Sequence, residues 1–216
     1  TVLRFDGFGW NEEPVAGTSQ PLLGVWGASQ VDVFAVGQFT VQHFDGQSWK
    51  TESLGLSVKE FTDVYGADAD NVWITARQGW VYSKTTASAG AWTQVQLDHK
   101  EDLHAVWVAD ASNVFVVGNK GVVSHYNGIG WSDMPTGSDK DLYAVWGSGP
   151  TDVYAVGEAG TILHYDGNQW ADQTPLDYTN TLVAVWGMGP GHALATGSHE
   201  FVLSPFVDVP VPKYPS

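Results

Sequence analysis

The chain contains no cysteine among its 216 residues. Disulfide bonds, thiol catalysis, cysteine-ligated zinc and iron–sulfur clusters are therefore excluded. Basic residues are also scarce, since 9 lysines and arginines stand against 24 aspartates and glutamates and give a formal net charge of −15. The nine positive residues are scattered from Arg4 to Lys213, so the field of the protein would repel a polyanion. We expect no nucleic-acid partner.

Long apolar runs are missing as well. No stretch approaches the roughly 18 apolar residues of a membrane-spanning helix, and no basic segment followed by an apolar one marks a signal peptide. The chain opens at Thr1 inside a strand-like segment, which suggests a mature, processed or excised chain. We expect an extracellular or cell-surface protein, secreted as a mature chain, without a transmembrane segment.

The sequence repeats itself with a period of roughly 40 residues. One aromatic residue follows a Leu/Phe-x-x-Val pattern five times, at intervals of 39, 42, 39 and 40 residues. A tryptophan also recurs five times, at intervals of 39, 43, 39 and 39 residues. The two sets are Trp26, Tyr65, Trp107, Trp146 and Trp186, and Trp10, Trp49, Trp92, Trp131 and Trp170. Two independent markers indicate five copies of one unit.

Each unit divides into four short segments, as in LYAVWG, DVYAVG, TILHYDG and NQWADQ. The segments are rich in β-branched and aromatic residues and are bounded by Gly, Asn or Asp, which is typical of strands. Such thin four-stranded units cannot form a core alone and must stack side by side in a ring. We therefore predict an all-β protein, a five-bladed β-propeller of four-stranded antiparallel blades. We expect the first-strand aromatic residues to be wedged between blades; the alternative is that they surround a channel and bind a sugar or a cation by stacking.

The two ends of the repeat region predict how the ring closes. The opening TVLRFDGFGW matches TVQHFDGQSW, a third-plus-fourth-strand piece, whereas LVAVWGMGPGHALATG is a first-plus-second-strand piece. We expect the N- and C-terminal segments to share one blade, which removes open sheet edges. The predicted propeller spans residues 1–206, with repeats near 22–60, 61–102, 103–141 and 142–181 and a closing blade of 182–206 with 1–21.

Two C-terminal segments do not fit this scheme. EFVLSPF looks like one third strand too many, so either it lies outside the closing blade or the N-terminal piece belongs to a larger propeller. Residues 207–216 contain three prolines and are interpreted as a Pro-rich tail or linker. Through this tail the domain could belong to a larger chain or assembly.

The signature AVWGSGPTDVYAVGxxGTILHYDGxxW resembles that of secreted bacterial repeat β-propellers, and it is similar to the Asp-box and photosystem-assembly-factor-like propeller families. The match covers nearly all of residues 1–206. The Asp-box pattern Ser-x-Asp-x-Gly-x-x-Thr-Trp is only partly kept, because HYDGNQW retains Asp166, Gly167 and Trp170 but lacks the Ser and the Thr. In that family the Asp-box is structural, so the resemblance implies a fold and no activity.

No group of residues that differs from its equivalents in the other repeats has the pattern of a catalytic site. Sialidase-like propellers use an arginine cluster and a tyrosine nucleophile, whereas this chain has only Arg4 and Arg77, in different repeats. Paired carboxylates for glycoside hydrolysis are available in number, but no pair stands out. His43, His125 and His164 share one third-strand position, far apart around a ring, so we expect a structural role. We predict no catalytic residue, no metal ligand and no cofactor.

Ligand-binding residues are expected on one face of loops, because rigid scaffolds place function on loops. The loops between second and third strands share this face with the long loops between repeats. Residues that break the repeat there are the candidates: Arg77, Trp80, Lys120, Glu158, His199 and Glu200. Trp80 replaces Thr or Val of other repeats, and the alternative interpretation is that it only covers a blade edge.

These features favour a non-catalytic extracellular or surface interaction module that presents its loop face to a protein partner or a glycan. One alternative is a multivalent carbohydrate-binding lectin, with several equivalent sugar sites between near-identical blades. A second alternative is a glycosidase or lyase.

Overall fold

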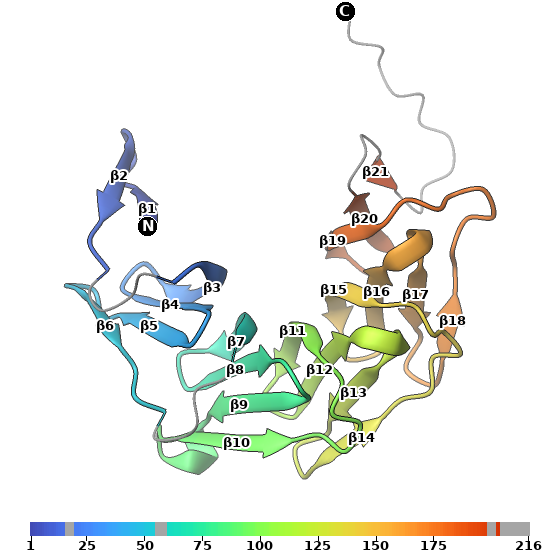
Figure 1. The fold of residues 1–216 in the computed structure, drawn as a ribbon, viewed down its shortest axis with the longest axis horizontal. Coiled ribbons are helices and arrows are strands. Elements are labelled where there is room, and N and C mark those ends of the chain that lie inside the picture. Colours follow the sequence, from blue (N-terminus) through green and yellow to red (C-terminus); the bar gives the residue numbers. More distant parts are fainter. Residues whose placement is uncertain (16–19, 55–59, 198–201, 204–216) are drawn as a thin grey trace, which may run out of the picture.

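The strands form sheets that follow one another along an arc in the computed structural model (Figure 1). The structure describes residues 1–15, 20–54, 60–197 and 202–203. Within this part, the strands make four four-stranded sheets, one three-stranded sheet and one two-stranded sheet. The pairings are antiparallel, and the first strands of successive blades pack against each other in the order β3, β7, β11, β15, β19. The prediction of an all-β, five-bladed propeller is confirmed.

The blades consist of consecutive strands. The first is β3 (Leu22–Ser29), β4 (Asp32–Gly37), β5 (Thr40–Phe44) and β6 (Trp49–Thr51). The second is β7 (Phe61–Asp68), β8 (Asn71–Ala76), β9 (Trp80–Lys84) and β10 (Trp92–Gln96). The third is β11 (Leu103–Asp110), β12 (Asn113–Gly118), β13 (Val123–Tyr126) and β14 (Trp131–Asp133). The fourth is β15 (Leu142–Gly149), β16 (Asp152–Gly157), β17 (Ile162–Tyr165) and β18 (Trp170–Asp172).

The remaining elements are a last blade, a hairpin and three short helical turns. The last blade is β19 (Leu182–Gly189), β20 (His192–Gly197) and β21 (Val202–Leu203), and the hairpin is β1 (Val2–Phe5) with β2 (Trp10–Glu13). The 3-10 turns are η1 (Thr86–Ser88), η2 (Asn119–Gly121) and η3 (Glu158–Gly160).

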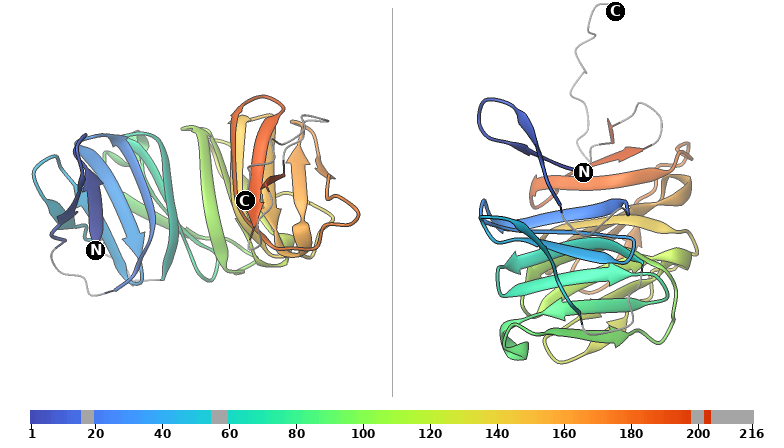
Figure 2. Two further views of the ribbon diagram at one scale, coloured as in Figure 1. Left: turned by 90° about the horizontal axis from the view of Figure 1, so that it is seen from above. Right: turned by 60° about the vertical axis from the view of Figure 1, so that its left-hand side comes forward.

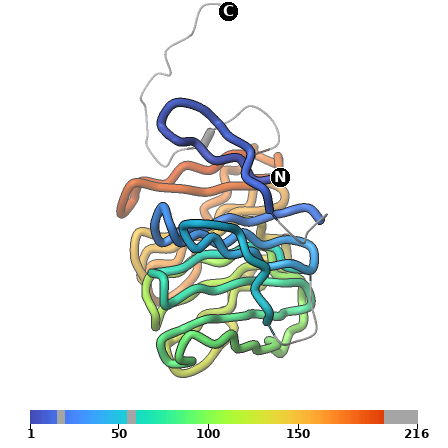
Figure 3. The backbone as a smooth tube through the Cα atoms, turned by 90° about the vertical axis from the view of Figure 1, so that its left-hand side faces the viewer, coloured from blue at the N-terminus to red at the C-terminus, as the bar shows by residue number. Residues whose placement is uncertain are grey.

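The closing blade differs from the sequence expectation. Within the described residues β1 pairs only with β2, and the third position beside β20 is held by β21, which belongs to the segment EFVLSPF. The hairpin extends beyond the β3–β6 sheet (dark blue in Figures 2 and 3) and packs there, with Val2 and Val15 against the cluster of Phe44 and Trp49. The physical reason is proximity, because β21 follows β20 directly in the chain whereas the hairpin precedes β3.

The core lies in the second strands of the first four blades. These strands have a neighbour on both sides and packing on both faces, so their sequences are nearly continuous apolar runs. In the last blade, β20 alternates between exposed and buried residues. Val36, Val72, Val116 and Val156 are fully shielded from solvent. Asx residues close the hairpins between third and fourth strands: Asp166 Oδ1 accepts the backbone N–H groups of residues 168 and 169, at 2.8 and 2.9 Å.

The three repeated histidines have the structural role expected of them. His164 Nε2 lies 2.7 Å from Asp152 Oδ1, and its ring stacks on Tyr154 with a centroid distance of 4.3 Å. His43 repeats both contacts with Asp32 and Phe34, and His125 repeats them with Asn113 and Phe115. Each histidine thus ties the third strand of its blade to the turn before the second strand.

Adjacent blades interlock through a tryptophan and a glycine. A Cβ atom placed on Gly147 would lie 2.6 Å from the Trp107 ring, and one on Gly187 would lie 2.4 Å from the Trp146 ring. Trp26 meets Gly66 in the same way, at 2.6 Å. The first-strand tryptophan of one blade therefore occupies space that only a glycine in the next blade leaves open, which confirms the predicted wedging for these three rings.

Candidate functional site

The loops between second and third strands share one backbone design. The residue in the middle of each loop is left-handed, with φ values of 61° for Gln78, 57° for Lys120 and 55° for Ala159. The residue before it donates its backbone N–H to a carbonyl just ahead of its own first strand, as Arg77 does to Glu60 and Glu158 does to Asp141. Arg77, Lys120 and Glu158 therefore lie at the same end of three consecutive blades.

The two predicted basic residues are held in ion pairs with acids of the segments that connect the blades. Arg77 Nη1 lies 2.8 Å from Asp102 Oδ2 and its Nε lies 3.0 Å from Glu60 Oε2, and the hydrogen bond to Asp102 raises the pKa of Arg77. Lys120 Nζ lies 2.9 Å from Glu101 Oε1, which raises the pKa of this lysine. Both cations are neutralised by acids of the protein, so this face offers no free positive charge at these two positions.

The other predicted residues do not join them in one site. Trp80 is half-buried and packs with Phe61 and Tyr82 on an apolar cluster, which matches the interpretation that it covers a blade edge. Glu158 is exposed; burial first, then the charges of Asp141 and Glu158, raise the pKa of Tyr143. His199 and Glu200 lie outside the described residues.

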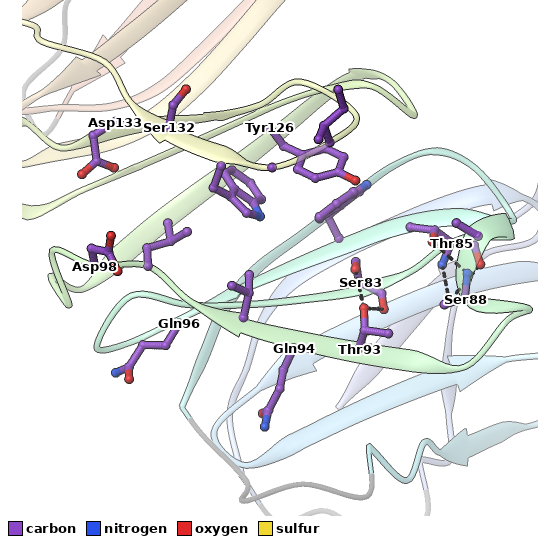
Figure 4. Close-up of a pocket in the computed structure, with 17 residues that line it drawn as sticks. Ser83, Thr85, Ser88, Thr93, Gln94, Gln96, Asp98, Tyr126, Ser132 and Asp133 are labelled. Carbon is purple, nitrogen blue, oxygen red and sulfur yellow. Dashed lines mark hydrogen bonds between the residues drawn. The ribbon is translucent and has the colours of Figure 1, made fainter.

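A cavity of about 680 Å³ lies between the second and third blades, away from the predicted residues (Figure 4). One wall comes from β9, β10 and the turn between them, and the other from β13, β14 and their turn. In Figure 4, Thr93, Gln94 and Gln96 lie on the β10 side, and Tyr126 and Ser132 on the opposite side. The volume suits a small ligand or a few residues of a peptide.

Three aromatic rings from two blades meet at this cavity. The Trp73 ring lies 5.0 Å from the Tyr126 ring and 5.7 Å from the Trp131 ring, between centroids, and the Tyr126 and Trp131 rings are 5.6 Å apart. Trp73 is only 3% exposed, and among the described residues no acceptor lies within hydrogen-bonding distance of its indole N–H. A buried donor without an acceptor is costly, but this nitrogen is shielded from the cavity, so a ligand can contact only the exposed parts of the three rings.

The rest of the lining mixes apolar side chains, such as Val95, Leu97 and Ile129, with polar ones and carries no basic side chain. Hydroxyl and amide groups come from Ser83, Thr85, Ser88, Thr93, Gln94, Gln96 and Ser132, and carboxylates come from Asp98 and Asp133. Some of these groups are already engaged, since Ser83 and Thr93 hydrogen-bond each other at 2.9 Å and Ser124 Oγ donates to Asp133 at 2.6 Å. The lining disfavours anionic ligands and favours neutral or cationic ones.

Two departures from the repeat build this cavity. In the second blade KTTASAG replaces the Asp-Gly turn, and it folds into η1 with a capping box in which Thr85 and Ser88 bond each other's backbone N–H. Trp73 is the second departure, because the equivalent second-strand positions carry Phe34, Phe115, Tyr154 and Leu194. The long turn was visible in the sequence, and both departures together are the signal that the sequence analysis missed.

Metal ligands do not gather in the part of the chain that the structure describes, where no group of three or more His, Cys, Asp or Glu residues could hold an ion. The same part has no helix with the length and apolar character needed to cross a membrane.

Comparison with known proteins gives structural neighbours only. No protein-family model matches the chain, and no curated protein matches it in sequence. Two solved structures of YCF48 are similar. The one from Cyanidioschyzon merolae has 13% identity and a TM-score of 0.63, over 87% of this chain and 67% of that chain. YCF48 bound to D1 peptide has 15% identity and a TM-score of 0.53, over 89% of this chain and 80% of that chain.

Virginiamycin B lyase from Staphylococcus aureus is similar at 12% identity and a TM-score of 0.73, over 89% of this chain and 68% of that chain. The likeness establishes a β-propeller. The predicted resemblance to photosystem-assembly-factor-like propellers is thereby confirmed as a likeness of fold. At these identities the neighbours carry no residue of an active site over to this chain.

Proposed function

We propose that the chain is a non-catalytic interaction module that binds an extended polypeptide segment of a protein partner in the cavity between the second and third blades. The observation that carries this proposal is the meeting of the Trp73, Tyr126 and Trp131 rings at a cavity whose lining also offers hydroxyl, amide and carboxylate groups. An aromatic or aliphatic side chain of the ligand packs against these rings, and its peptide groups hydrogen-bond the polar lining.

The outermost strand of the second blade supports an extended ligand. β10 is five residues long, whereas the equivalent strands β6, β14 and β18 have three each. Among the described strands β10 pairs only with β9, so its other edge offers unpaired backbone groups. An added peptide strand uses such an edge for affinity and nearby pockets for specificity. YCF48, a propeller of similar fold, has been solved with a bound peptide.

The negative charge of the chain and of the cavity limits the kind of partner segment that can bind. The formal net charge is −15, and Asp98 and Asp133 line the cavity without a basic neighbour in the lining. A neutral or basic segment is attracted and an acidic one repelled, most strongly at low ionic strength. The acidic coat also fits our expectation of an extracellular or surface setting, which we keep as part of the proposal.

A glycan is the second candidate for this cavity. Aromatic rings beside hydroxyl and amide groups suit a sugar, whose faces are apolar and whose edges carry hydroxyls. This candidate shares the site with the first, so one set of variants tests both.

The test uses Ser132→Arg, which fills the cavity from an exposed position on β14, and Ala171→Arg, which places the same group at the equivalent exposed position on β18. Both variants and the parent chain are probed with an immobilised random peptide library and a glycan array. Peptides held by the parent and by Ala171→Arg but lost by Ser132→Arg support the proposal. Glycan signals with that pattern and no peptide signal replace the polypeptide with a sugar. Binding that Ser132→Arg leaves intact, or no binding to either probe, overturns the proposed site.

A further inference from the structure

The tryptophan–glycine junction leaves one tryptophan without a glycine at the C-terminal end of the arc. Trp186 on β19 is equivalent to Trp26, Trp107 and Trp146, yet it is 59% exposed. Leu194, which lies opposite Trp186 on the adjacent β20, is 40% exposed. An exposed group of large apolar side chains of this kind marks an interaction surface in a soluble protein.

The opposite end of the arc leaves one glycine without a tryptophan. Gly27 on β3 is equivalent to Gly66, Gly147 and Gly187, but the atoms nearest to a Cβ placed there belong to its own blade: Val33 Cγ2, the Asp32 carbonyl and the Ser29 carbonyl. Val25 on the same strand is 69% exposed. The two ends of the row are therefore the two halves of one inter-blade junction.

The hairpin β1–β2 lies beside this glycine end in the position of the outer half of a preceding blade. Trp49 Nε1 donates to Glu13 Oε2 at 2.7 Å, and one repeat later Trp92 Nε1 donates to Glu52 Oε2 at 3.4 Å. The hairpin thus contacts the first blade as the outer strands of the first blade contact the second. Its blade lacks inner strands, and β19–β20 at the other end are inner strands whose only outer neighbour in the described chain is the two-residue β21.

We propose that a second copy of this chain docks head to tail on the first, with β19 of one copy packed against β3 of the other and Trp186 seated at Gly27. Each copy carries both halves of the junction, and the halves lie at opposite ends of the arc in Figure 1, so they meet between two molecules. The hairpin of the second copy then lies beside β20 and extends its sheet, in place of the short β21. The contact is heterologous, because two different surfaces meet. The β3 surface of one copy and the β19 surface of the other therefore stay unoccupied in the pair.

Sedimentation velocity of the full chain over a range of concentrations tests this proposal. We expect concentration-dependent self-association that added salt strengthens, because two molecules of net charge −15 repel each other. Trp186→Ala removes the inserted ring, and Gly27→Ala fills its seat; the φ of Gly27 is not left-handed, and Val33 Cγ2, 3.1 Å from the added Cβ, must shift by a few tenths of an ångström. Each should weaken association at least tenfold. Leu176→Ser, at a fully exposed loop position, is the matched control and should leave it unchanged.

Three results would overturn the inference. The first is a monomer at all concentrations with Trp186 open to a fluorescence quencher. The second is a monomer in which Trp186 becomes shielded, which would mean that the two ends meet within one molecule. The third is self-association that survives both Trp186→Ala and Gly27→Ala. Circular dichroism and urea unfolding of each variant separate a lost contact from a lost fold.

Discussion

Ionisation of Asp63 should destabilise the folded protein increasingly as pH rises, and replacing Asp63 with asparagine should remove this effect. Asp63 lies on β7, where the equivalent positions carry Gly24, Ala105 and other small residues. Its Oδ1 accepts the backbone N–H of Val64 at 2.8 Å, and its Oδ2 accepts that of Val106, in the next blade, at 3.1 Å. Burial outweighs these hydrogen bonds and raises the pKa of Asp63 to about 6.

The sign and size of the effect follow from this pKa. The folded pKa of Asp63 lies above the ordinary value of 3.8, so its contribution to the free energy of unfolding is fully present below pH 3.8 and is lost as pH rises through 6. One pKa unit corresponds to about 1.4 kcal/mol, so the buried charge costs about 3 kcal/mol at pH 7 and well under 1 kcal/mol at pH 4. The stability of Asp63→Asn relative to the parent should therefore rise by about 2 kcal/mol between pH 4 and pH 7.

Urea unfolding followed by tryptophan fluorescence, repeated at several pH values, measures this difference. Subtracting the two proteins at each pH removes the titration of the other 23 acidic residues, which both share (24 − 1). Asp166→Asn is the control: backbone N–H groups lower the pKa of Asp166 from its ordinary 3.8, so its contribution is lost only as pH falls below that value, and its difference from the parent should stay nearly constant from pH 4 to pH 7. A constant difference between Asp63→Asn and the parent from pH 4 to pH 7 would refute the reasoning.

Two further predictions concern the packing and the hydrogen bonds of the blades. Gly147→Ala should lower the free energy of unfolding, measured by urea unfolding, by about 1–3 kcal/mol, because its Cβ would lie 2.6 Å from the Trp107 ring. The control Gly149→Ala, whose Cβ would have no atom within 4 Å, should change the free energy of unfolding by less than about 0.5 kcal/mol. His164→Ala should lower the unfolding free energy by about 1–3 kcal/mol through loss of the bond to Asp152 and the stacking on Tyr154; an unchanged urea midpoint would contradict this structural role.

The repeat made most of the fold predictable from the sequence. Strand positions, the Asx turns and the wedging of Trp107 or Trp146 all depend on local patterns that recur every blade, so each copy supports the others. Ring closure was not predictable in the same way. It depends on how the curvature summed over all junctions places β19 relative to β3, and no local pattern encodes that sum.

The candidate site was less predictable for a related reason. Arg77 and Lys120 stood out because they break the repeat, but their partners Asp102 and Glu101 come from loops whose approach only the fold defines. The cavity beside Trp73 forms where two blades diverge, so its two walls are far apart in the sequence. A residue that departs from the repeat marks a candidate position, but only its contacts with neighbouring parts of the fold determine whether it forms an ion pair or lines a cavity.

The tryptophan–glycine junction gives the row of blades a direction, because a blade such as the fourth carries the Trp146 ring on one side and, at Gly147, room for a ring on the other. The junction between the second and third blades differs, with Tyr65 and Val108 at these positions. Duplication or loss of a whole repeat that has both residues leaves every remaining pair matched, whereas a break inside a repeat leaves one partner unmatched. Genes encoding such chains can therefore lengthen or shorten by recombination in whole-repeat steps without redesign of the core. The connecting loops, which take no part in the pairing, remain free to diversify.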